Sequence, residues 1–192
     1  MSSCKNCPET TAMTCFLSSY QCLLFNIGLR AADHVPDFNQ GTIRFGIVSP
    51  LKPQRMSEVS QTIGTSRTRS AGWRNDPNNP EIDTSGYSAL KLASAYANLS
   101  SSEKHPQIIG RAQSRGAFVV QLLYGEVNLD LVVSVSGATG EEDQFVAATI
   151  LLFLEQVIGE NRELSSCLKK LSTEYPDIFE RAREFLHDKF PA

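Results

Sequence analysis

The chain has 192 residues, of which 41% are hydrophobic and 20% are charged, with a formal net charge of −3. This composition suits one folded domain with an appendage, and it excludes wholesale disorder and a general nucleic-acid binder, which would carry a basic excess. No uninterrupted apolar run reaches the roughly 20 residues that span a bilayer, and the N-terminus lacks the pattern of a signal peptide. We therefore expect a cytoplasmic protein with no nucleic-acid or membrane partner.

The cysteines are concentrated at the N-terminus, where Cys4, Cys7, Cys15 and Cys22 lie, while Cys167 stands alone near the other end. Cys4 and Cys7 have the C-x-x-C spacing of zinc and redox sites, but no second such pair completes a zinc site. Cys15 and Cys22 are seven positions apart on a predicted helix and therefore share one face. Buried free thiols are the simpler interpretation, and we expect no metal.

The first part of the chain predicts a loose tail over residues 1–9, then a helix and a strand. Apolar residues recur at helical spacing from about Thr11, and Gly28 is the expected helix stop. The alternation over Thr42–Val48 predicts a half-buried strand.

Residues 49–83 are rich in proline and in basic side chains, and they predict only two short strands, around Glu58–Ile63 and Arg67–Trp73. The basic side chains can bind a carboxylate or phosphate group of a ligand, or they can keep a loop or edge strand solvated, which is the interpretation we favour. Trp73 and Tyr87 can line a flat apolar pocket or belong to the core. The basic residues of the segment are Lys52, Arg55, Arg67, Arg69 and Arg74.

Two adjoining strands are the clearest elements that the sequence predicts. Ala117–Tyr124 and Asn128–Val135 are joined by Gly125–Glu126, which can form a tight turn, so an antiparallel hairpin is expected. Their nearly continuous apolar character indicates central strands covered on both faces. A helix over Tyr87–Ala97 is expected to precede them.

The stretch SVSGATGEEDQFVAATILLFLEQVIG combines a strand end, a turn and a long helix. Thr139 and Glu142 have capping-box spacing, and carboxylates in the first turn suit the helix dipole. The Ser136–Gly137 turn could hold an anion, but acidic side chains already occupy that helix start, so a structural role is favoured. The helix is apolar nearly all round, which predicts cover from a sheet and from a second element, often a neighbouring subunit.

The remaining residues, 160–192, predict two amphipathic helices as a C-terminal extension of a domain spanning 10–159. Consecutive hairpin strands with helices before and after them predict an α+β fold, in which helices pack against a mostly antiparallel sheet. No repeat, P-loop, dinucleotide fingerprint or Ser-His-Asp order is present.

The segment Val132–Ala148 resembles the C-terminal signature of the GlcG/HbpS-like haem-degrading-domain family, a strand followed by S-G-x-T-x-x-x-D and an Ala-rich helix. It is also similar to the S-G-x-x-x-E-E-D turn of the eukaryotic branch of that superfamily. The match covers residues 85–159, and Lys91 stands where the family's middle helix has a Lys or similar residue. The motif positions are held by Ser136, Gly137, Thr139 and Asp143.

The resemblance implies an α/β/α sandwich with a five-stranded antiparallel sheet flanked by helices, and assembly into dimers or larger rings. It also implies haem or another tetrapyrrole as a ligand, for which His34 is the best-placed of the three histidines. A surface position without a functional role is the simpler interpretation for each histidine. Two departures are SPLKPQRM in place of the family's V-D-x-x-G-x-L hairpin, and the continuation over 160–192.

Three functions from different classes follow. The first is a small-molecule pocket protein that binds haem or another polycyclic ligand near the contacts of a homo-oligomer. The second is a cofactor-free isomerase, cyclase or lyase acting on a metabolic intermediate, and the third is an oligomeric adaptor that docks through its C-terminal helices. The predicted ligand-binding residues are Arg67, Arg69, Trp73, Arg74, Tyr87, Lys91 and His34, and the predicted structural residues of the turn and cap are Ser136, Gly137, Thr139, Glu142 and Asp143.

Overall fold

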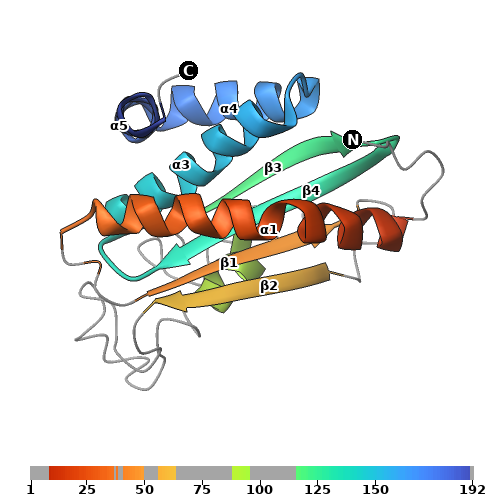
Figure 1. The fold of residues 1–192 in the computed structure, drawn as a ribbon, viewed down its shortest axis with the longest axis horizontal. Coiled ribbons are helices and arrows are strands. Elements are labelled where there is room, and N and C mark those ends of the chain that lie inside the picture. The colour runs from red at the N-terminus through yellow and green to blue at the C-terminus, as the bar shows by residue number, and fades with distance from the viewer. Residues whose placement is uncertain are drawn as a thin grey trace.

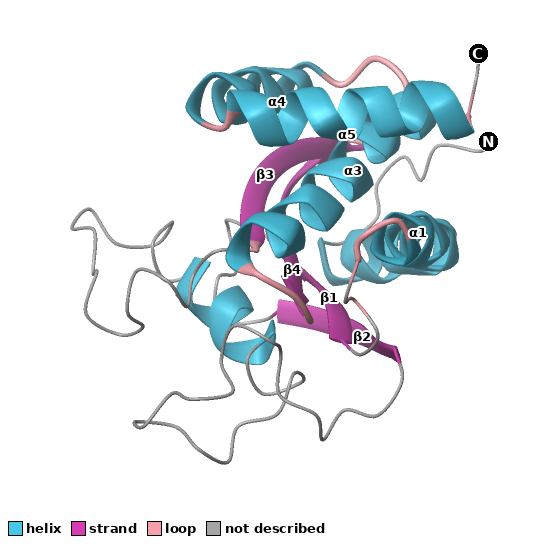
Figure 2. Cartoon of the chain, turned by 90° about the vertical axis from the view of Figure 1, so that its left-hand side faces the viewer, coloured by secondary structure: helices cyan, strands magenta, loops and turns pink. Residues whose placement is uncertain are grey.

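One antiparallel sheet with helices on both faces forms the framework of the computed structural model (Figures 1 and 2). The structure describes residues 9–36, 38, 41–49, 56–63, 88–95 and 116–190. In chain order the elements are α1 (Glu9–Asp33), β1 (Gly41–Val48), β2 (Met56–Ile63), a helical segment at residues 88–95, β3 (Ala117–Tyr124), β4 (Val127–Ser136), α3 (Gly140–Ile158), α4 (Arg162–Glu174) and α5 (Pro176–Lys189).

The sheet has the strand order β2-β1-β4-β3, and every neighbouring pair is antiparallel. The α+β prediction is confirmed, and so is the hairpin of β3 and β4. The expected five strands are wrong, because the described sheet has four. The second short strand predicted in residues 49–83 lies outside the described residues.

The edge of the sheet at β3 is closed by side chains of the C-terminal extension. The Asn161 side chain accepts a hydrogen bond from the Leu123 backbone N–H at 3.2 Å and donates one to the Leu123 carbonyl at 2.8 Å. The Gln121 N–H donates to Cys167 Sγ at 3.4 Å. The backbone groups at Leu123 and the Gln121 N–H, which a further strand beside β3 would use, are thus taken. Within the described sheet β3 is an edge strand, contrary to the prediction of two central strands.

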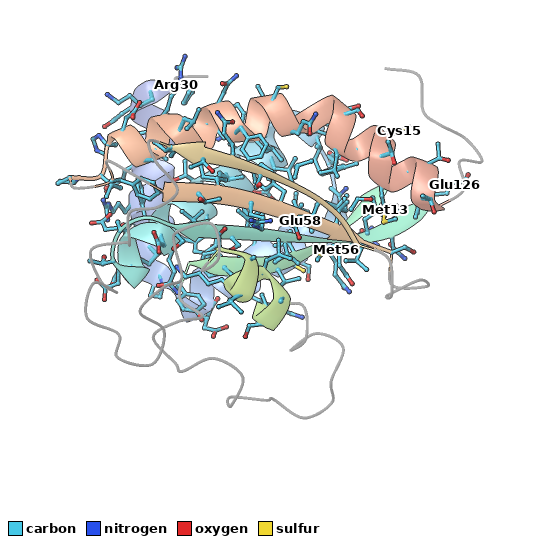
Figure 3. All side chains as sticks on the ribbon, turned by 90° about the horizontal axis from the view of Figure 1, so that it is seen from below. Met13, Cys15, Arg30, Met56, Glu58 and Glu126 are labelled. Atoms are coloured by element: carbon cyan, nitrogen blue, oxygen red, sulfur yellow. The ribbon has the colours of Figure 1, made fainter. Side chains whose placement is uncertain are left out.

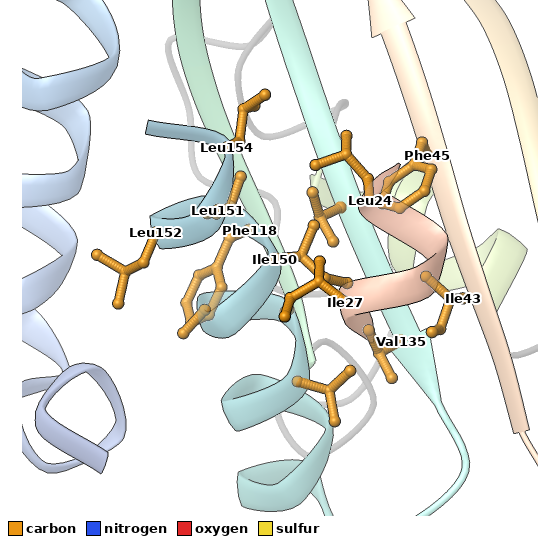
Figure 4. Close-up of a cluster of buried hydrophobic side chains, with 14 of the residues drawn as sticks. Leu24, Ile27, Ile43, Phe45, Phe118, Val135, Ile150, Leu151, Leu152 and Leu154 are labelled. Atoms are coloured by element: carbon orange, nitrogen blue, oxygen red, sulfur yellow. The ribbon is translucent and has the colours of Figure 1, made fainter. Parts of the chain in front are cut away.

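The inner face of the sheet, which faces α1 and α3, is apolar because every second residue of β1 and β4 is large and hydrophobic. Ile43, Phe45, Val133 and Val135 are wholly buried there. Figure 4 shows how side chains of α1 and α3 interleave with those of the strands. This face carries the hydrophobic core.

Helix α3 is covered along most of its length by elements of its own chain. It contacts the strands on one side, α1 beside it, and α4 and α5 on the far side (Figure 2). All of its residues from Asp143 to Leu152 are therefore buried. The all-round apolar character that predicted a neighbouring subunit is explained within one chain, so homo-oligomerisation stays a prediction without this support.

Helices α4 and α5 turn their apolar side chains toward α3 and β3. The buried residues include Leu164 and Leu168 of α4 and Phe179 and Phe185 of α5. The extension was proposed as a docking surface for a partner. Its hydrophobic faces are already occupied, so the adaptor hypothesis would have to rely on polar contacts.

Helix α1 does not end at Gly28 but continues to Asp33, so the predicted stop is wrong. A Cβ atom at Gly28 would lie 2.8 Å from Cδ1 of Ile43 and 2.8 Å from Cδ1 of Ile150. The glycine therefore allows α1 to approach β1 and α3 closely, and it does not terminate the helix.

Among the described residues, α1 is the one helix long and apolar enough to cross a membrane by length and composition, which differs from the expectation that no segment qualifies. The core helix of a folded domain passes the same test. Phe16, Leu24 and Ile27 of α1 are buried in the hydrophobic core.

Candidate functional site

The opposite surface of the sheet, here called the outer face, carries polar side chains at positions that are nonetheless buried. Thr42, Ser134 and Ser136 have no exposed area, and Asp130 is 7% exposed. The strand alternation explains this, because these residues occupy the positions between the apolar residues of the inner face. The outer face includes Thr42, Arg44, Gly46 and Val48 of β1, Met56 and Glu58 of β2, and Asp130, Val132, Ser134 and Ser136 of β4.

The helical segment 88–95 lies against this outer face, on the other side of the sheet from α1 (Figure 2). Leu92 packs over Gly46, where an added Cβ would be 3.0 Å from Leu92 Cδ1. At the start of the segment, the Ser134 hydroxyl donates to the Ser88 carbonyl at 2.7 Å. One apolar and one polar contact thus fix the segment over the middle of β1 and β4.

Lys91 forms a completely buried ion pair with Asp143 of α3. Its Nζ lies 2.6 Å from Asp143 Oδ2 and donates to the Val135 carbonyl at 2.8 Å. The two side chains are 1% and 0% exposed. Because Lys91 and Asp143 come from different elements, the pair joins the segment 88–95, the end of β4 and the start of α3.

The Asp143 carboxylate also binds the turn that precedes its own helix. Oδ1 accepts from the Ala138 backbone N–H at 3.0 Å, and the Gly137 backbone donates to the same carboxylate. Burial raises the pKa of Asp143, while Lys91 and the two backbone donors oppose that rise. Gly116, at φ +99°, covers the site, and a Cβ there would lie 2.5 Å from Asp143 Cβ.

Arg44 lies on the outer face between β2 and the segment 88–95. Its Nε donates to the Ser88 hydroxyl at 3.2 Å, and its Nη1 forms an ion pair with Glu58. The Arg44 side chain is only 11% exposed, whereas that of Glu58 is 36% exposed. Burial lowers the pKa of the Arg44 guanidinium. Figure 3 shows Glu58 and Met56 on the side of β2 that faces the segment 88–95.

Three buried polar atoms of the described residues have no hydrogen-bond partner: Ser49 Oγ, Asp130 Oδ1 and Ser136 Oγ. Asp130 and Ser136 belong to the outer face. Ser49 directly follows Val48, whose Cα partner on β4 is Asp130. Unsatisfied buried groups are uncommon in folded proteins, and a bound water or ion is one way to satisfy them.

The structure describes two of the predicted ligand-binding residues. Lys91 is fully engaged with Asp143 and Val135, and so it holds the fold together. His34 is exposed in the turn after α1, and its ring lies against Phe185 of α5 at 5.3 Å between centroids. Lys91 thus lies against β4 and α3, whereas His34 lies against α5. Five predicted residues lie outside the described part of the chain: Arg67, Arg69, Trp73, Arg74 and Tyr87.

The capping box predicted at the start of α3 is half formed. Thr139 Oγ1 accepts from the Glu142 backbone N–H at 3.3 Å. The Glu142 side chain forms an ion pair with Arg181 of α5 at 2.8 Å, and Arg181 also lies 4.0 Å from the centre of the Phe145 ring. Glu142 therefore ties α5 to the start of α3.

The described cysteines, Cys15, Cys22 and Cys167, are free thiols. Cys22 is exposed and the other two are only half-buried, so the expectation of buried thiols is wrong for these three cysteines. Within the described ranges no three His, Cys, Asp or Glu side chains gather closely enough to hold a metal ion. Cys4 and Cys7 lie outside those ranges.

The surroundings of His34 do not fit an axial haem ligand. An axial histidine projects into an apolar slot that covers both faces of the porphyrin. His34 is at the surface, and Phe185 covers its ring. The second described histidine, His187, is 87% exposed. Haem binding stays a prediction, and the described residues supply no buried histidine for it.

The chain matches no protein-family model, no curated protein and no solved structure in the comparisons made. The resemblance to the GlcG/HbpS-like family accordingly stays a prediction.

Sequence analysis missed Arg44 and Asp130 as candidate functional residues. Each is a charged residue between two apolar residues of a strand. Arg44 stands between Ile43 and Phe45, and Asp130 stands between Leu129 and Leu131. A charged side chain inside an otherwise hydrophobic strand is the signal that could have identified them.

Proposed function

We propose that the chain binds a small anionic molecule, carrying a carboxylate or phosphate group, at Arg44 on the outer face of the sheet. The observation that carries the proposal is a guanidinium nearly removed from solvent and oriented by the Ser88 hydroxyl. Arginine is suited to this role because its planar array of donors matches a carboxylate or phosphate.

The Glu58 carboxylate occupies the place that we propose for the anionic group of the ligand. Its carboxylate already binds Arg44 Nη1, which indicates that the site accepts an oxyanion. Glu58 is carried by β2, the strand at the other edge of the described sheet, and it is more exposed than Arg44. Exchange of the Glu58 carboxylate for a ligand carboxylate leaves the charge around Arg44 unchanged, so the exchange avoids exposing an unpaired buried cation.

In the sequence, the residues around Arg44 are also connected to the basic segment that was predicted to bind a ligand. Ser88, which orients Arg44, is preceded in the chain by Tyr87 and by the segment that carries Arg67, Arg69 and Arg74. These four residues remain predicted contributors to the same anion site. The coarse function of a small-molecule-binding protein is thereby kept, and the ligand class proposed is an anion in place of a tetrapyrrole.

The test uses thermal denaturation with inorganic phosphate, pyrophosphate, succinate and citrate at constant ionic strength. We expect at least one anion to raise the Tm of the wild-type protein in a saturable way, and the shift to disappear in Arg44→Gln. Glu58→Gln should bind the same anion more tightly, because the competing carboxylate is gone.

Arg181→Gln is the matched control, since it removes another Arg–Glu ion pair, the one between α5 and the start of α3. The control should keep the anion-induced shift. The proposal fails if none of the four anions stabilises the wild type, or if Arg44→Gln responds like the control.

A further inference from the structure

We propose that the chain forms a two-fold symmetric dimer through the exposed side of α1 and the neighbouring edge of the sheet at β2. The proposal does not depend on the anion site. The two elements contact each other and lie on the same side of the molecule (Figure 2). Together they are called here the α1–β2 surface, which comprises the strand β2 and, on α1, Thr11, Thr14, Ser18 and Cys22.

The exposed side of α1 lacks the charges that other surface helices of the chain carry. Every exposed residue of α1 from Thr10 to Asn26 is uncharged, and only 39% of the most apolar stretch of the helix is buried. The exposed residues of α5 are mostly charged, among them Asp177, Glu180 and Arg183. A solvated helix face normally carries charged residues, whereas the core of a protein interface is depleted of them.

Ser18 marks the side of α1 that lies toward the sheet edge. It is two turns from Phe25 and therefore on the same side of the helix. The Phe25 ring lies 4.6 Å from the ring of Phe45 in β1. Arg30 projects from another side of α1, where it lies 5.3 Å from the centre of the Phe190 ring that follows α5. The uncharged residues around Ser18 are thus next to β1 and β2, away from the C-terminal helices.

Strand β2 supplies the second part of the surface. It pairs with β1 over Met56–Ile63 without a bulge, and within the described sheet no strand lies on its other side. It contains no Lys, Arg or Pro, residues that commonly protect an edge from a neighbouring strand. Its one charged residue, Glu58, forms an ion pair with Arg44 of the same chain. A further antiparallel strand can therefore add at this edge.

A second copy of the chain fits both parts of the surface through one symmetry operation. A two-fold axis perpendicular to the sheet pairs β2 antiparallel with its copy, as all neighbours in the described sheet are paired. The same axis places both α1 helices side by side on one face of the joined sheet. In such an isologous contact a surface meets itself, so a charged helix face would repel its copy. Any other partner would have to present both an edge strand and an uncharged helix.

The size of the α1–β2 surface predicts a weak dimer. The eight residues of β2 extend about 26 Å at the usual rise of a strand. A helix packed beside a strand adds a width of about 20 Å. The contact then buries about 500 Å² on each copy, which is near the lower limit for a specific interface. We therefore expect the dimer to dissociate at micromolar concentration.

Analytical ultracentrifugation of the full chain, from micromolar to millimolar concentration and with a reductant present, measures this association. The wild type should approach twice the chain mass. Ser18→Arg brings two like charges into the contact, so it should weaken dimerisation about tenfold or more. Ser166→Arg is the matched control, because it makes the same substitution at an exposed serine of α4, and it should dimerise like the wild type.

Hydrogen exchange followed by NMR provides a second readout without a variant. The β2 N–H groups that point away from β1 should exchange more slowly as the protein concentration rises, whereas the exchange of β3 should not change. The proposal is overturned if the wild type stays monomeric, if Ser18→Arg associates like Ser166→Arg, or if exchange in β2 does not depend on concentration. A monomer that binds phosphatidylcholine vesicles through α1 also overturns it, since a lipid surface is then the partner.

Discussion

The inner face of the sheet meets α1 and α3 through apolar side chains such as Ile43 and Phe45. The segment 88–95 on the other side is held mainly by polar groups: hydroxyl contacts and Leu92 fix it on the outer face, and the Lys91–Asp143 ion pair ties it to the start of α3. Apolar contacts are non-directional and tolerate small changes in shape. Buried polar contacts depend on every donor having an acceptor. The inner face therefore provides most of the stability, and the outer face provides positions at which a ligand can be recognised.

The largest effect is expected from Lys91→Met, which removes one member of the buried ion pair. Asp143 is then left as an uncompensated buried carboxylate, so the free energy of unfolding should fall by about 3–5 kcal/mol. Urea denaturation measures the loss.

The double variant Lys91→Met/Asp143→Leu tests whether that loss comes from the pair itself. It should recover part of the stability, though not all, because the Ala138 and Gly137 N–H groups lose their acceptor. If the loss of the double variant equals the sum of the losses measured for Lys91→Met and Asp143→Leu alone, Lys91 and Asp143 are not coupled.

A smaller effect is expected on the inner face, where Ile43→Val removes one methylene from a fully buried side chain. The loss should be about 0.5–1.5 kcal/mol, because neighbouring apolar groups can relax into the space. Urea denaturation again provides the measurement. A loss as large as that of Lys91→Met would erase the proposed difference between the two faces.

The smallest effect is the dependence of stability on pH that comes from Asp130. Burial raises the pKa of its carboxyl above the ordinary value of 3.8. The folded state then holds the proton more tightly than the unfolded state, so the stabilising contribution is complete below pH 3.8 and is lost as the pH rises through the folded pKa.

Comparison with Asp130→Asn isolates this contribution, since the other carboxyl groups are common to both proteins. The stability of the wild type relative to the variant should decrease as the pH rises from 3 toward 7. A difference that stays constant across this range would show that Asp130 titrates alike in the folded and unfolded states.

Local patterns predicted much of the fold. The bounds of β3 and the turn at Gly125–Glu126 agree with the structure because the alternation and the turn residues lie within one short stretch of sequence. Gly28 was misread because its role depends on Ile43 and Ile150, which come from distant parts of the chain. Sequence spacing carries no information on such an approach.

The candidate site was predicted less well, for a related reason. Lys91 was named as a ligand-binding residue, yet its partner Asp143 lies 52 positions away and was assigned to the helix cap. Arg44 lies within the strand predicted over Thr42–Val48, but nothing in the sequence pattern marked it as a functional residue. Its importance depends on Ser88 and Glu58, which the folded sheet brings to it.

The side-chain amide of Asn161 has a consequence for behaviour at high concentration. Its oxygen and nitrogen present to Leu123 the same acceptor and donor that a neighbouring strand would present. If α4 and α5 detach while the sheet stays folded, that backbone becomes a free edge to which another chain can add. The attachment of the two terminal helices then determines how readily the protein aggregates, separately from how stably its core is folded.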